Sequence, residues 1–416
     1  MLVIFTKSYP YDLAAEQTFL ANELSHLVEK FDRVIVVPKL RSGGRSTPPP
    51  GVEIEEGFAD FFKKNSRLVQ LFKIGFTSSY PYQEICEHPL LLFYPAKILK
   101  LLLYSGRAEI VKKWLENFMK TCQIEQECVI LYSYWFDDIA MGLGLTKEKF
   151  PQVKIVSRAH GYDIYEELYF PYYWPLRRQA LTALDRLFPA SYDGRDYFCN
   201  RYPEFPDLFE TAHLGVEDPG FISKSSEDGI LRIVSCAHIV PLKRIGLLLE
   251  GIAYAARKRP NQKFEWHHFG EGQARGKLLN AVRKRFPRNA TGNLPGYVPN
   301  QDILLHYKES PVDVFVNLSI TEGGAPVSIM EAISCGIPVI VTRVGGNPEI
   351  VSDKNGILLN PNPTPEEIAM ALLKIWDDPT LAAKMRKESR RVWQTSYNAD
   401  VNFRNFAERL KSIGES

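Results

Sequence analysis

The sequence lacks paired cysteines, long apolar runs and an excess of charge of one sign. Its six cysteines are scattered without a CxxC motif, which argues against a disulfide framework and a cysteine zinc site, so we expect reduced thiols and no metal. The first apolar run, MLVIF, is too short for a signal peptide, and no stretch has the length of a membrane span, so we expect a cytoplasmic protein. Lys and Arg number 51 and Asp and Glu 49, and this balance argues against nucleic acid as a partner.

The sequence does contain enough apolar material for large cores. Apolar residues make up 45% of the 416 residues and charged residues 24%, which is the composition of a soluble globular protein. A chain of this length exceeds one ordinary hydrophobic core. Two domains are the simplest expectation.

Short β-branched runs alternate with longer helical patterns, as in parallel βαβ units. One series of predicted strands covers 2–5, 33–37, 128–131, 154–157 and 186–188, with a helix at 14–28, and a second series covers 231–236, 263–269, 312–318, 338–342 and 356–359. We therefore expect an α/β fold with two doubly wound, Rossmann-like domains that face each other across a cleft. Ligands of such domains bind at the carboxyl ends of the strands.

Two segments interrupt this alternation. Glu217 to Gly229 (EDPGFISKSSEDG) is polar and rich in Ser, Asp and Gly, which is typical of an interdomain linker. Phe58 to Tyr104 mixes aromatic residues, leucines and lysines. This stretch fits an amphipathic, basic surface that touches a membrane or a lipid-linked molecule, and it fits equally a set of helices packed on the first domain.

The segment from Thr321 to Val351 predicts a phosphate site. It follows an apolar strand, turns through Gly323 and Gly324, and begins a helix at Pro326, whose fixed φ suits a first helical position. A helix N-terminus preceded by glycines offers backbone N–H groups and the positive end of the helix dipole to an anion.

Two glutamates flank this turn. Glu331 shares a helical stripe with Val327 and Ser334, so we expect its carboxylate to face inward and to accept hydrogen bonds from neighbouring hydroxyls, as on a ribose. The alternative is an ordinary glutamate at the rim of the helix. Glu322 stands at the strand exit, where its carboxylate can meet a sugar or remain a solvated loop charge.

The start of the second series carries a basic cluster, in the sequence SCAHIVPLKR. With Pro241 near the helix start, we expect Lys243 and Arg244 in the first helical turn, where cations oppose the helix dipole and a diphosphate would compensate them. The alternative is a loop lysine in water. His238, at the strand end, could equally be a structural histidine.

A third strand exit, in the sequence KIVSRAHGYDIY, carries Arg158, His160 and Asp163. Such exits line the cleft of doubly wound domains. His160 could hydrogen-bond a sugar hydroxyl or a leaving phosphate and Asp163 could orient it, or both could be turn residues.

Together these motifs resemble glycosyltransferase family 4, whose members have the GT-B fold of two facing Rossmann-like domains. The resemblance covers nearly the whole chain, and it is most specific where Pro326–Ala332 (PVSIMEA) and Gly336–Ile340 (GIPVI) match the acidic motif of the family. It implies an acceptor-side domain at 1–215, a nucleotide-sugar-binding domain at 216–395 and a last helix at 396–416 that packs back on the first domain.

The resemblance and the residue patterns together give a candidate site. The catalytic candidates are His160, Lys243 and Glu322. Glu331 would bind the donor ribose, Glu322 the hydroxyls of the donor sugar, Lys243 a phosphate, and His160 the donor sugar from the first domain. The donor-binding candidates are His238, Lys243, Arg244, Glu322, Gly323, Gly324, Ala325, Pro326, Val327 and Glu331. The acceptor-side candidates are Arg158, Asp163 and Glu16, the last within the loop that usually takes the acceptor.

Three features depart from the family pattern. Glu322 and Glu331 are separated by eight residues, whereas the family has seven. The phosphate-contacting arginine of the family, five residues before the lysine, is His238 here. The first loop, TKSYPYDLAAEQ, has no glycine.

The resemblance implies a retaining transfer of a sugar from a nucleotide-sugar donor to a glycan or lipid-linked acceptor. The sequence shows no DxD-like motif at a suitable strand end, so we expect a metal-independent reaction with no cofactor. The aromatic and basic Phe58–Tyr104 stretch suggests a lipid-linked or polysaccharide acceptor, and hence bacterial surface polysaccharide synthesis. The same stretch suggests contact with the cytoplasmic face of the inner membrane. Two alternatives stay open at this point: a nucleotide-sugar epimerase of the same architecture, and a non-catalytic member of a polysaccharide assembly complex.

Overall fold

The computed structural model describes residues 1–11, 16–121, 129–324 and 326–415, and the chain divides into two compact units. The amino-terminal unit comprises Met1–Leu214 and Asp400–Ser416, and the carboxyl-terminal unit comprises Gly215–Ala399. The chain therefore returns to the first unit for its last helix.

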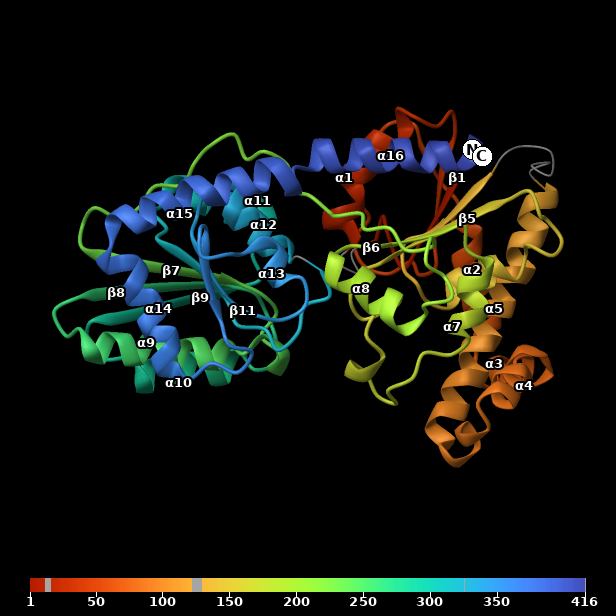
Figure 1. The fold of residues 1–416 in the computed structure, drawn as a ribbon, viewed down its shortest axis with the longest axis horizontal. Helices are drawn as coiled ribbons and strands as arrows, with labels where there is room; N and C mark the ends of the chain where they lie inside the picture. The colour runs from red at the N-terminus through yellow and green to blue at the C-terminus, as the bar shows by residue number, and fades with distance from the viewer. Residues whose placement is uncertain (12–15, 122–128, 325, 416) are drawn as a thin grey trace. The chain divides into compact units, whose positions relative to one another are not determined.

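Six parallel strands form the sheet of the amino-terminal unit, in the order β3-β2-β1-β4-β5-β6 (Figure 1). They are β1 (Leu2–Thr6), β2 (Val34–Pro38), β3 (Val52–Ile54), β4 (Ile130–Ser133), β5 (Lys154–Ala159) and β6 (Arg186–Pro189). Along β1, Val3 and Phe5 enter one hydrophobic core and Leu2 and Ile4 enter another. A parallel strand covered on both faces needs apolar side chains on both, which explains the unbroken apolar run of β1.

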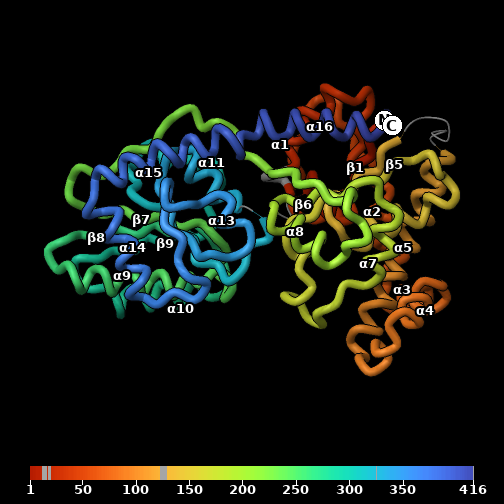
Figure 2. The backbone as a smooth tube through the Cα atoms, viewed as in Figure 1, coloured from red at the N-terminus to blue at the C-terminus, as the bar shows by residue number. Residues whose placement is uncertain are grey.

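Helices supply the other half of each core in this unit. Leu20 of α1 (Glu16–Val28) and Phe406 of α16 (Ala399–Glu415) pack in the core that contains Leu2. Phe58 of α2 (Gly57–Asn65) and Trp114 of α5 (Pro95–Thr121) pack in the core that contains Phe5. Figures 1 and 2 show α16, in blue, running beside α1. The helical segments are α1 (Glu16–Val28), α2 (Gly57–Asn65), α3 (Leu68–Thr77), α4 (Tyr80–Glu87), η1 (Pro89–Phe93), α5 (Pro95–Thr121), α6 (Asp138–Gly144), η3 (Glu166–Leu168), α7 (Arg177–Ala183), α8 (Tyr192–Arg201) and α16 (Ala399–Glu415).

The carboxyl-terminal unit has a second six-stranded parallel sheet, in the order β12-β11-β10-β7-β8-β9. Its strands are β7 (Ile230–Cys236), β8 (Lys263–Phe269), β9 (Ala290–Gly296), β10 (Val314–Asn317), β11 (Val339–Thr342) and β12 (Gly356–Leu359). Its helical segments are η4 (Pro241–Lys243), α9 (Ile245–Lys258), α10 (Arg275–Arg285), α11 (Asn300–Glu309), α12 (Val327–Ser334), α13 (Asn347–Ile350), α14 (Pro365–Asp377), α15 (Pro379–Val392) and η5 (Trp393–Tyr397).

Both sheets have the strand order of a Rossmann-type fold, so the predicted α/β class with two doubly wound sheets is confirmed. Ligands of such sheets bind outside the carboxyl ends of the strands, at the switch point where the strand order reverses. The switch point lies between β1 and β4 in the amino-terminal unit and between β7 and β10 in the carboxyl-terminal unit.

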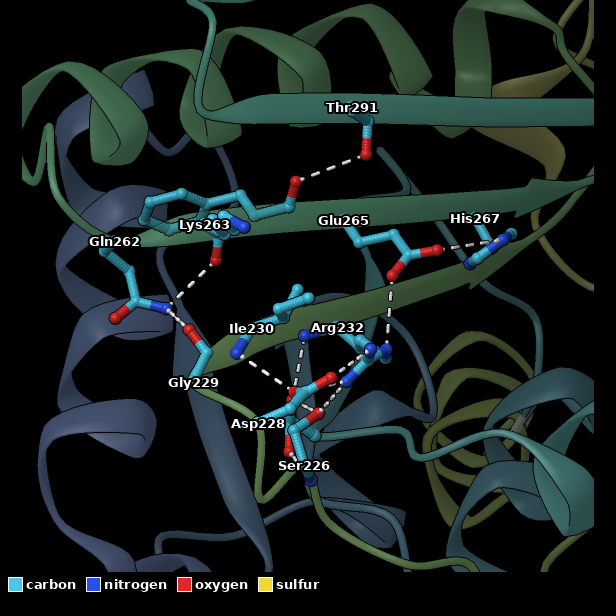
Figure 3. A network of polar contacts seen from close by, with 12 residues as sticks. Ser226, Asp228, Gly229, Ile230, Arg232, Gln262, Lys263, Glu265, His267 and Thr291 are labelled. Carbon is cyan, nitrogen blue, oxygen red and sulfur yellow. Dashed lines mark hydrogen bonds and ion pairs between the residues drawn. The ribbon is translucent and has the colours of Figure 1, made fainter.

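A polar network at the start of β7 anchors the end of the predicted linker (Figure 3). Arg232 donates to the two carboxylate oxygens of Asp228 at 2.8 and 2.7 Å, and its Nε donates to Glu265 of β8 at 3.1 Å. The hydroxyl of Ser226 donates to Asp313 at 2.7 Å. The last residues of the linker are therefore held against the amino ends of the strands, away from the strand exits.

Ten of the strands follow the prediction to within about two residues, and two were not predicted. The unpredicted β3 has three residues, and the unpredicted β9 contains Gly292 and Pro295. Both strands lie at an edge of their sheet, where proline and short length are tolerated. The start of the predicted helix at 14–28 and Cys128 of the predicted strand at 128–131 lie outside the described residues.

The Phe58–Tyr104 stretch forms helices α2, α3 and α4, the segment η1 and the start of α5. Phe58, Phe62, Leu71 and Leu101 are buried in the core of the amino-terminal unit, so the expectation of helices packed on this unit is confirmed for these residues. Other side chains of the same stretch, such as Leu90 and Phe93, are exposed.

The cysteines of the described residues are unpaired thiols, namely Cys86, Cys199, Cys236 and Cys335, whereas Cys122 and Cys128 lie outside these residues. Within the described part of the chain, no group of three or more His, Cys, Asp or Glu side chains is arranged to hold a metal ion. Among the helices that the structure describes, none is both long enough and apolar enough to cross a bilayer.

Candidate active site

The switch point of the carboxyl-terminal unit brings two predicted site residues together. Lys243 follows β7 at the end of η4, Glu322 follows β10, and the Lys243 Nζ donates to the Glu322 carboxylate. The two loops are also joined through the backbone, because the Ile320 N–H donates to the Leu242 carbonyl at 2.9 Å. The sequence separates these residues by almost eighty positions, and the fold makes them neighbours.

The ion pair is shielded from water. The Glu322 side chain is 11% exposed and that of Lys243 is 21% exposed, and the side-chain amide of Asn317 donates to the same Glu322 oxygen at 3.3 Å. Partial burial strengthens the attraction between opposite charges because it lowers the local dielectric. Glu322 is therefore not a solvated loop charge, and its longer spacing from Glu331 does not prevent the contact with Lys243.

Gly345, after β11, fixes the position of Glu322. A Cβ atom at Gly345 would lie 1.6 Å from the Glu322 carbonyl oxygen, and the glycine has a φ of +47°. Both the close approach and the left-handed backbone require glycine at this position. The loops after β10 and β11 are thus packed backbone to backbone, and this contact sets where the Glu322 carboxylate lies.

Helix α12 places Glu331 inside the unit, as its helical stripe predicts. The residue is 6% exposed, and its carboxylate accepts a hydrogen bond of 2.5 Å from the side-chain amide of Asn300, at the start of α11. Burial raises the pKa of the Glu331 carboxyl to about 7, although the Asn300 hydrogen bond acts in the opposite direction. The group therefore changes charge near neutral pH.

With Glu331 on the donor ribose, as the resemblance implies, the raised pKa predicts a pH-dependent affinity for nucleotide diphosphates. Ribose hydroxyls donate hydrogen bonds, so the ionised form of Glu331 should bind them better than the protonated form, which prevails below pH 7. Between about pH 6 and about pH 8 we expect roughly tenfold tighter binding at the higher pH, because the ionised fraction rises by about that factor. Isothermal titration with UDP, GDP and ADP at both pH values measures it. The Glu331→Gln variant should bind weakly with little pH dependence; an unchanged pH dependence in this variant would contradict the assignment.

The start of α12 has the geometry of an anion site. The helix begins at Val327, Pro326 precedes it with φ −62° and ψ 135°, and Gly323 and Gly324 lie in the bend before it. The first amide groups of a helix have no partner within it, so those of Val327 and Ser328 are available at this end. Proline thus stands one position before the first helical residue, and Ala325 lies outside the described residues.

The basic cluster after β7 differs from its predicted form. Lys243 ends a short 3-10 turn, Arg244 adopts a left-handed backbone with φ 49°, and α9 begins only at Ile245. The prediction that both cations lie in the first turn of the helix is therefore wrong. The Arg244 guanidinium donates to the Pro361 carbonyl and to Asn362, whereas His238 is exposed. Among the described residues of this basic cluster, only Lys243 contacts Glu322.

Glu16 closes the switch point of the amino-terminal unit. Its buried carboxylate accepts hydrogen bonds from the backbone N–H groups of Lys7 (2.6 Å), Ser8 (2.7 Å) and Tyr9 (3.0 Å) after β1. It also accepts one from the Trp135 indole N–H (2.5 Å) after β4. Glu16 was an acceptor-side candidate; in the structure its carboxylate is enclosed and its hydrogen bonds are made within the amino-terminal unit.

We expect Glu16→Gln to act on stability. The amide NH2 of glutamine would face backbone donors that now meet a carboxylate oxygen, and leaving buried donors unpaired costs about 1–3 kcal/mol. Chemical denaturation measures the change in the free energy of unfolding. The matched control is Glu29→Gln, an exposed residue just after α1, with an expected change within about 0.5 kcal/mol. Equal stability of the two variants would show that the Glu16 hydrogen bonds contribute nothing.

Arg158, the second acceptor-side candidate, is wholly buried. Its guanidinium pairs with Glu23 at 3.0 Å, donates to the Tyr132 hydroxyl at 2.8 Å, and lies 3.9 Å from the ring centroid of Phe406 in α16. The residue therefore ties β5 to α1 and α16. The position of Arg158 at a strand exit predicts where its backbone lies, but its side chain points back into the unit.

Asp163 and His160 form a turn after β5. The buried Asp163 carboxylate accepts hydrogen bonds from the backbone N–H groups of His160 (2.8 Å), Gly161 (2.9 Å) and Phe136 (3.0 Å). It therefore positions the His160 backbone and is itself closed to an acceptor, which corrects its predicted acceptor-side role.

The His160 ring has a defined tautomer. Its Nε2 lies 2.9 Å from the Tyr134 carbonyl oxygen, and a carbonyl only accepts, so Nε2 carries the proton and Nδ1 is left as the acceptor nitrogen. Burial lowers the pKa of His160 to about 4, so the ring is neutral at physiological pH. A neutral imidazole held in this way can accept a hydrogen bond from a hydroxyl.

Comparison with known proteins finds a family match for the carboxyl-terminal unit of the chain. Residues 222–392, which include β7 to β12 and both Lys243 and Glu322, match the family described as Glycosyl transferases group 1. The chain therefore contains a region of this family, within its carboxyl-terminal unit. Its fold is also that of a solved structure, HepE of Anabaena in complex with UDP and glucose, with a TM-score of 0.65 at 16% identity over 99% of this chain and 100% of HepE.

Glycosyltransferases named for amylovoran and colanic acid biosynthesis are among the similar sequences. The amylovoran biosynthesis glycosyltransferase AmsK of Erwinia amylovora is 25% identical over 213 residues, which are 50% of this chain and 51% of AmsK. The putative colanic acid biosynthesis glycosyltransferase WcaL of Salmonella typhimurium is 24% identical over 270 residues, which are 62% of this chain and 64% of WcaL. The chain thus spans about half to two thirds of the length of these relatives.

Three residues of the candidate site were not predicted: Asn300, Asn317 and Gly345. Asn317 ends an apolar strand, where a polar residue signals an exit, and this signal could have been used. Asn300 and Gly345 act through contacts with residues more than twenty positions away, so no local pattern marks them.

Proposed function

We propose that the protein is a retaining glycosyltransferase that moves a sugar from a nucleotide-sugar donor to a glycan or lipid-linked acceptor in bacterial surface polysaccharide synthesis. The observation that carries this proposal is the Lys243–Glu322 pair at the switch point of the carboxyl-terminal unit. A lysine beside a carboxylate suits a nucleotide-sugar, because the lysine can bind its anionic diphosphate and the carboxylate can accept hydrogen bonds from its sugar hydroxyls.

Lys243 and the start of α12 would stabilise the leaving diphosphate. Negative charge grows on the bridging phosphate oxygen as the bond to the sugar breaks, and a cation already in place lowers the barrier without reorganisation. The amide groups of Val327 and Ser328 add the positive end of a helix dipole. His238, exposed on the loop after β7, would add a hydrogen-bond donor where the family has arginine.

The remaining groups would orient the donor. Glu331 would accept hydrogen bonds from the ribose hydroxyls, and Glu322 from hydroxyls of the transferred sugar. His160, neutral and held by Tyr134, would accept a hydroxyl hydrogen bond at Nδ1. The departing phosphate would take the proton of the acceptor hydroxyl, so no protein nucleophile enters this proposal, and we expect turnover to persist with EDTA.

A donor screen tests the proposal. The full chain is incubated with UDP-, GDP- and ADP-sugars, with and without polysaccharide or lipid-linked acceptors, and nucleoside diphosphate release and glycosylated product are measured. We expect one donor to give acceptor-dependent product with retained anomeric configuration. An epimerised sugar formed without acceptor would establish the epimerase, and no thermal stabilisation by any nucleoside diphosphate would favour a non-catalytic member.

A further inference from the structure

A pocket of about 470 Å³ lies in the amino-terminal unit, outside the residues assigned to sugar transfer. Its walls come from α4, η1 and the start of α5 on one side and from residues 166–178 with the end of α8 on the other. The hydroxyl of Tyr173 donates to Glu84 at 2.7 Å and joins the two walls. The pocket is therefore built partly by the Phe58–Tyr104 stretch that the site does not use.

The acidic groups of the pocket are already satisfied. Glu84 accepts hydrogen bonds from Tyr173 and from the Leu176 N–H. Glu166 accepts one from the Tyr202 hydroxyl at 2.9 Å and pairs with Arg201 at 2.7 Å. The carboxylates thus serve to hold the walls together and leave little acceptor capacity for the pocket.

Two donors of the pocket are not satisfied. Nε1 of Trp174 and Nη1 of Arg177 are buried and have no hydrogen-bond partner among the described residues, and Arg177 is 4% exposed. Lys97 also lines the pocket, and within the described part of the chain it contacts the rings of Tyr94 and Tyr173 with no carboxylate at ion-pair distance. Unpaired donors and unpaired cations together call for a ligand that brings acceptor oxygens and negative charge.

The mouth of the pocket is apolar. Leu90, Tyr94 and Tyr172 line it and are 70%, 54% and 59% exposed. Their chain neighbours Leu92, Phe93 and Phe170 are exposed by 64%, 77% and 74%, and these six residues are here called the apolar rim.

The apolar rim belongs to a larger concentration of exposed apolar side chains. Of the twenty-two large hydrophobic residues exposed in the described chain, fourteen lie within residues 68–99 and 168–172. Residues 57–104 also carry six Lys and Arg against three Asp and Glu. Figures 1 and 2 show α3 and α4, in orange, extending beyond the sheet of their unit. A basic, apolar projection of this kind matches the charge of an anionic bilayer and its apolar interior.

We propose that this pocket binds the phosphate group of a membrane lipid while the apolar rim inserts into the headgroup region of the bilayer surface. The phosphate oxygens accept from Trp174 and Arg177 and compensate the charge of Lys97, and the lipid chain leaves through the apolar rim. A soluble phosphate would satisfy the same donors but would leave the apolar rim in water. The proposal does not depend on the donor site, and it gives the Phe58–Tyr104 stretch a defined ligand.

Vesicle co-sedimentation of the full chain tests the proposal, with phosphatidylcholine vesicles with and without phosphatidylglycerol. We expect about tenfold tighter binding to the anionic vesicles. Lys97→Gln should remove most of that preference, and Leu92→Ser with Phe93→Ser should weaken binding to both vesicle types by about tenfold or more. The matched controls, Lys374→Gln and Met370→Ser on α14, change an exposed cation and an exposed apolar residue elsewhere and should bind as wild type.

Three results would overturn the proposal. They are absence of vesicle binding by the wild type, equal anionic preference in Lys97→Gln and wild type, and wild-type vesicle binding by the Leu92 and Phe93 variant. A parallel thermal-shift titration with inorganic phosphate separates the sources of the ligand: Lys97-dependent stabilisation by phosphate without vesicle binding would assign the pocket to a soluble anion. Circular dichroism of each variant excludes misfolding as the cause of a loss.

Discussion

Lys243→Met should lower the rate of sugar transfer by about a hundredfold to a thousandfold, the range found when one preorganised stabiliser of developing charge is removed. Methionine keeps much of the length of the side chain but removes the charge that would face the leaving diphosphate. It also leaves Glu322, now 11% exposed, without its ion-pair partner. Steady-state kinetics with the donor found in the screen measures the effect on kcat and on kcat/KM.

The control for Lys243→Met is Lys374→Met, which removes an exposed lysine of α14 in the same unit. Its rate should match that of the wild type. If Lys243→Met kept wild-type kcat/KM while the protein remained folded, the switch point would not be where the leaving group is stabilised.

Gly345→Ala should abolish most of the activity and lower the free energy of unfolding by about 2–5 kcal/mol. The new Cβ would lie 1.6 Å from the Glu322 carbonyl oxygen, so the loops after β10 and β11 must separate. The positive φ of 47° adds strain, because a side chain disfavours left-handed backbone. Displacement of Glu322 would break its contact with Lys243, and we therefore expect a loss of transfer of about a hundredfold or more. Denaturation and initial rates measure the two effects.

Gly220→Ala isolates the backbone strain from the clash. Gly220 has a φ of +75° and nothing within 4 Å of the added Cβ, so the variant should lose only about 1–2 kcal/mol and keep its activity. Equal losses in the two variants would mean that strain alone, and not the contact with Glu322, makes Gly345 necessary.

The sheets were predictable because their strands are buried on both faces. A buried parallel strand requires a run of apolar residues, as in Val339–Thr342, and the alternation of such runs with helical patterns gives the α/β class directly. The edge strand β9 was missed because an edge tolerates glycine and proline, which remove that signal. Helix geometry also predicted that Glu331 faces inward, since position along a helix decides its face.

The direction of several side chains at or near strand exits could not be predicted. Arg158 and Glu16 stand at or near strand exits, yet their partners, among them Phe406 and Trp135, come from distant parts of the chain. A sequence pattern places the backbone of an exit but does not say which long-range partner captures the side chain. The same reason explains why the approach of Gly345 to Glu322 became evident only in the folded chain.

Glu16 supplies the amino-terminal unit with an anion of its own. The three backbone N–H groups after β1 converge as they would around a phosphate, but they converge on a carboxylate that the chain already carries. The two units share a strand order, but the Glu16 carboxylate makes them unequal as nucleotide-binding units. A nucleoside diphosphate would have to displace Glu16 in the amino-terminal unit, whereas the carboxyl-terminal unit presents no such obstacle among its described residues. A titration should therefore saturate at one nucleotide per chain.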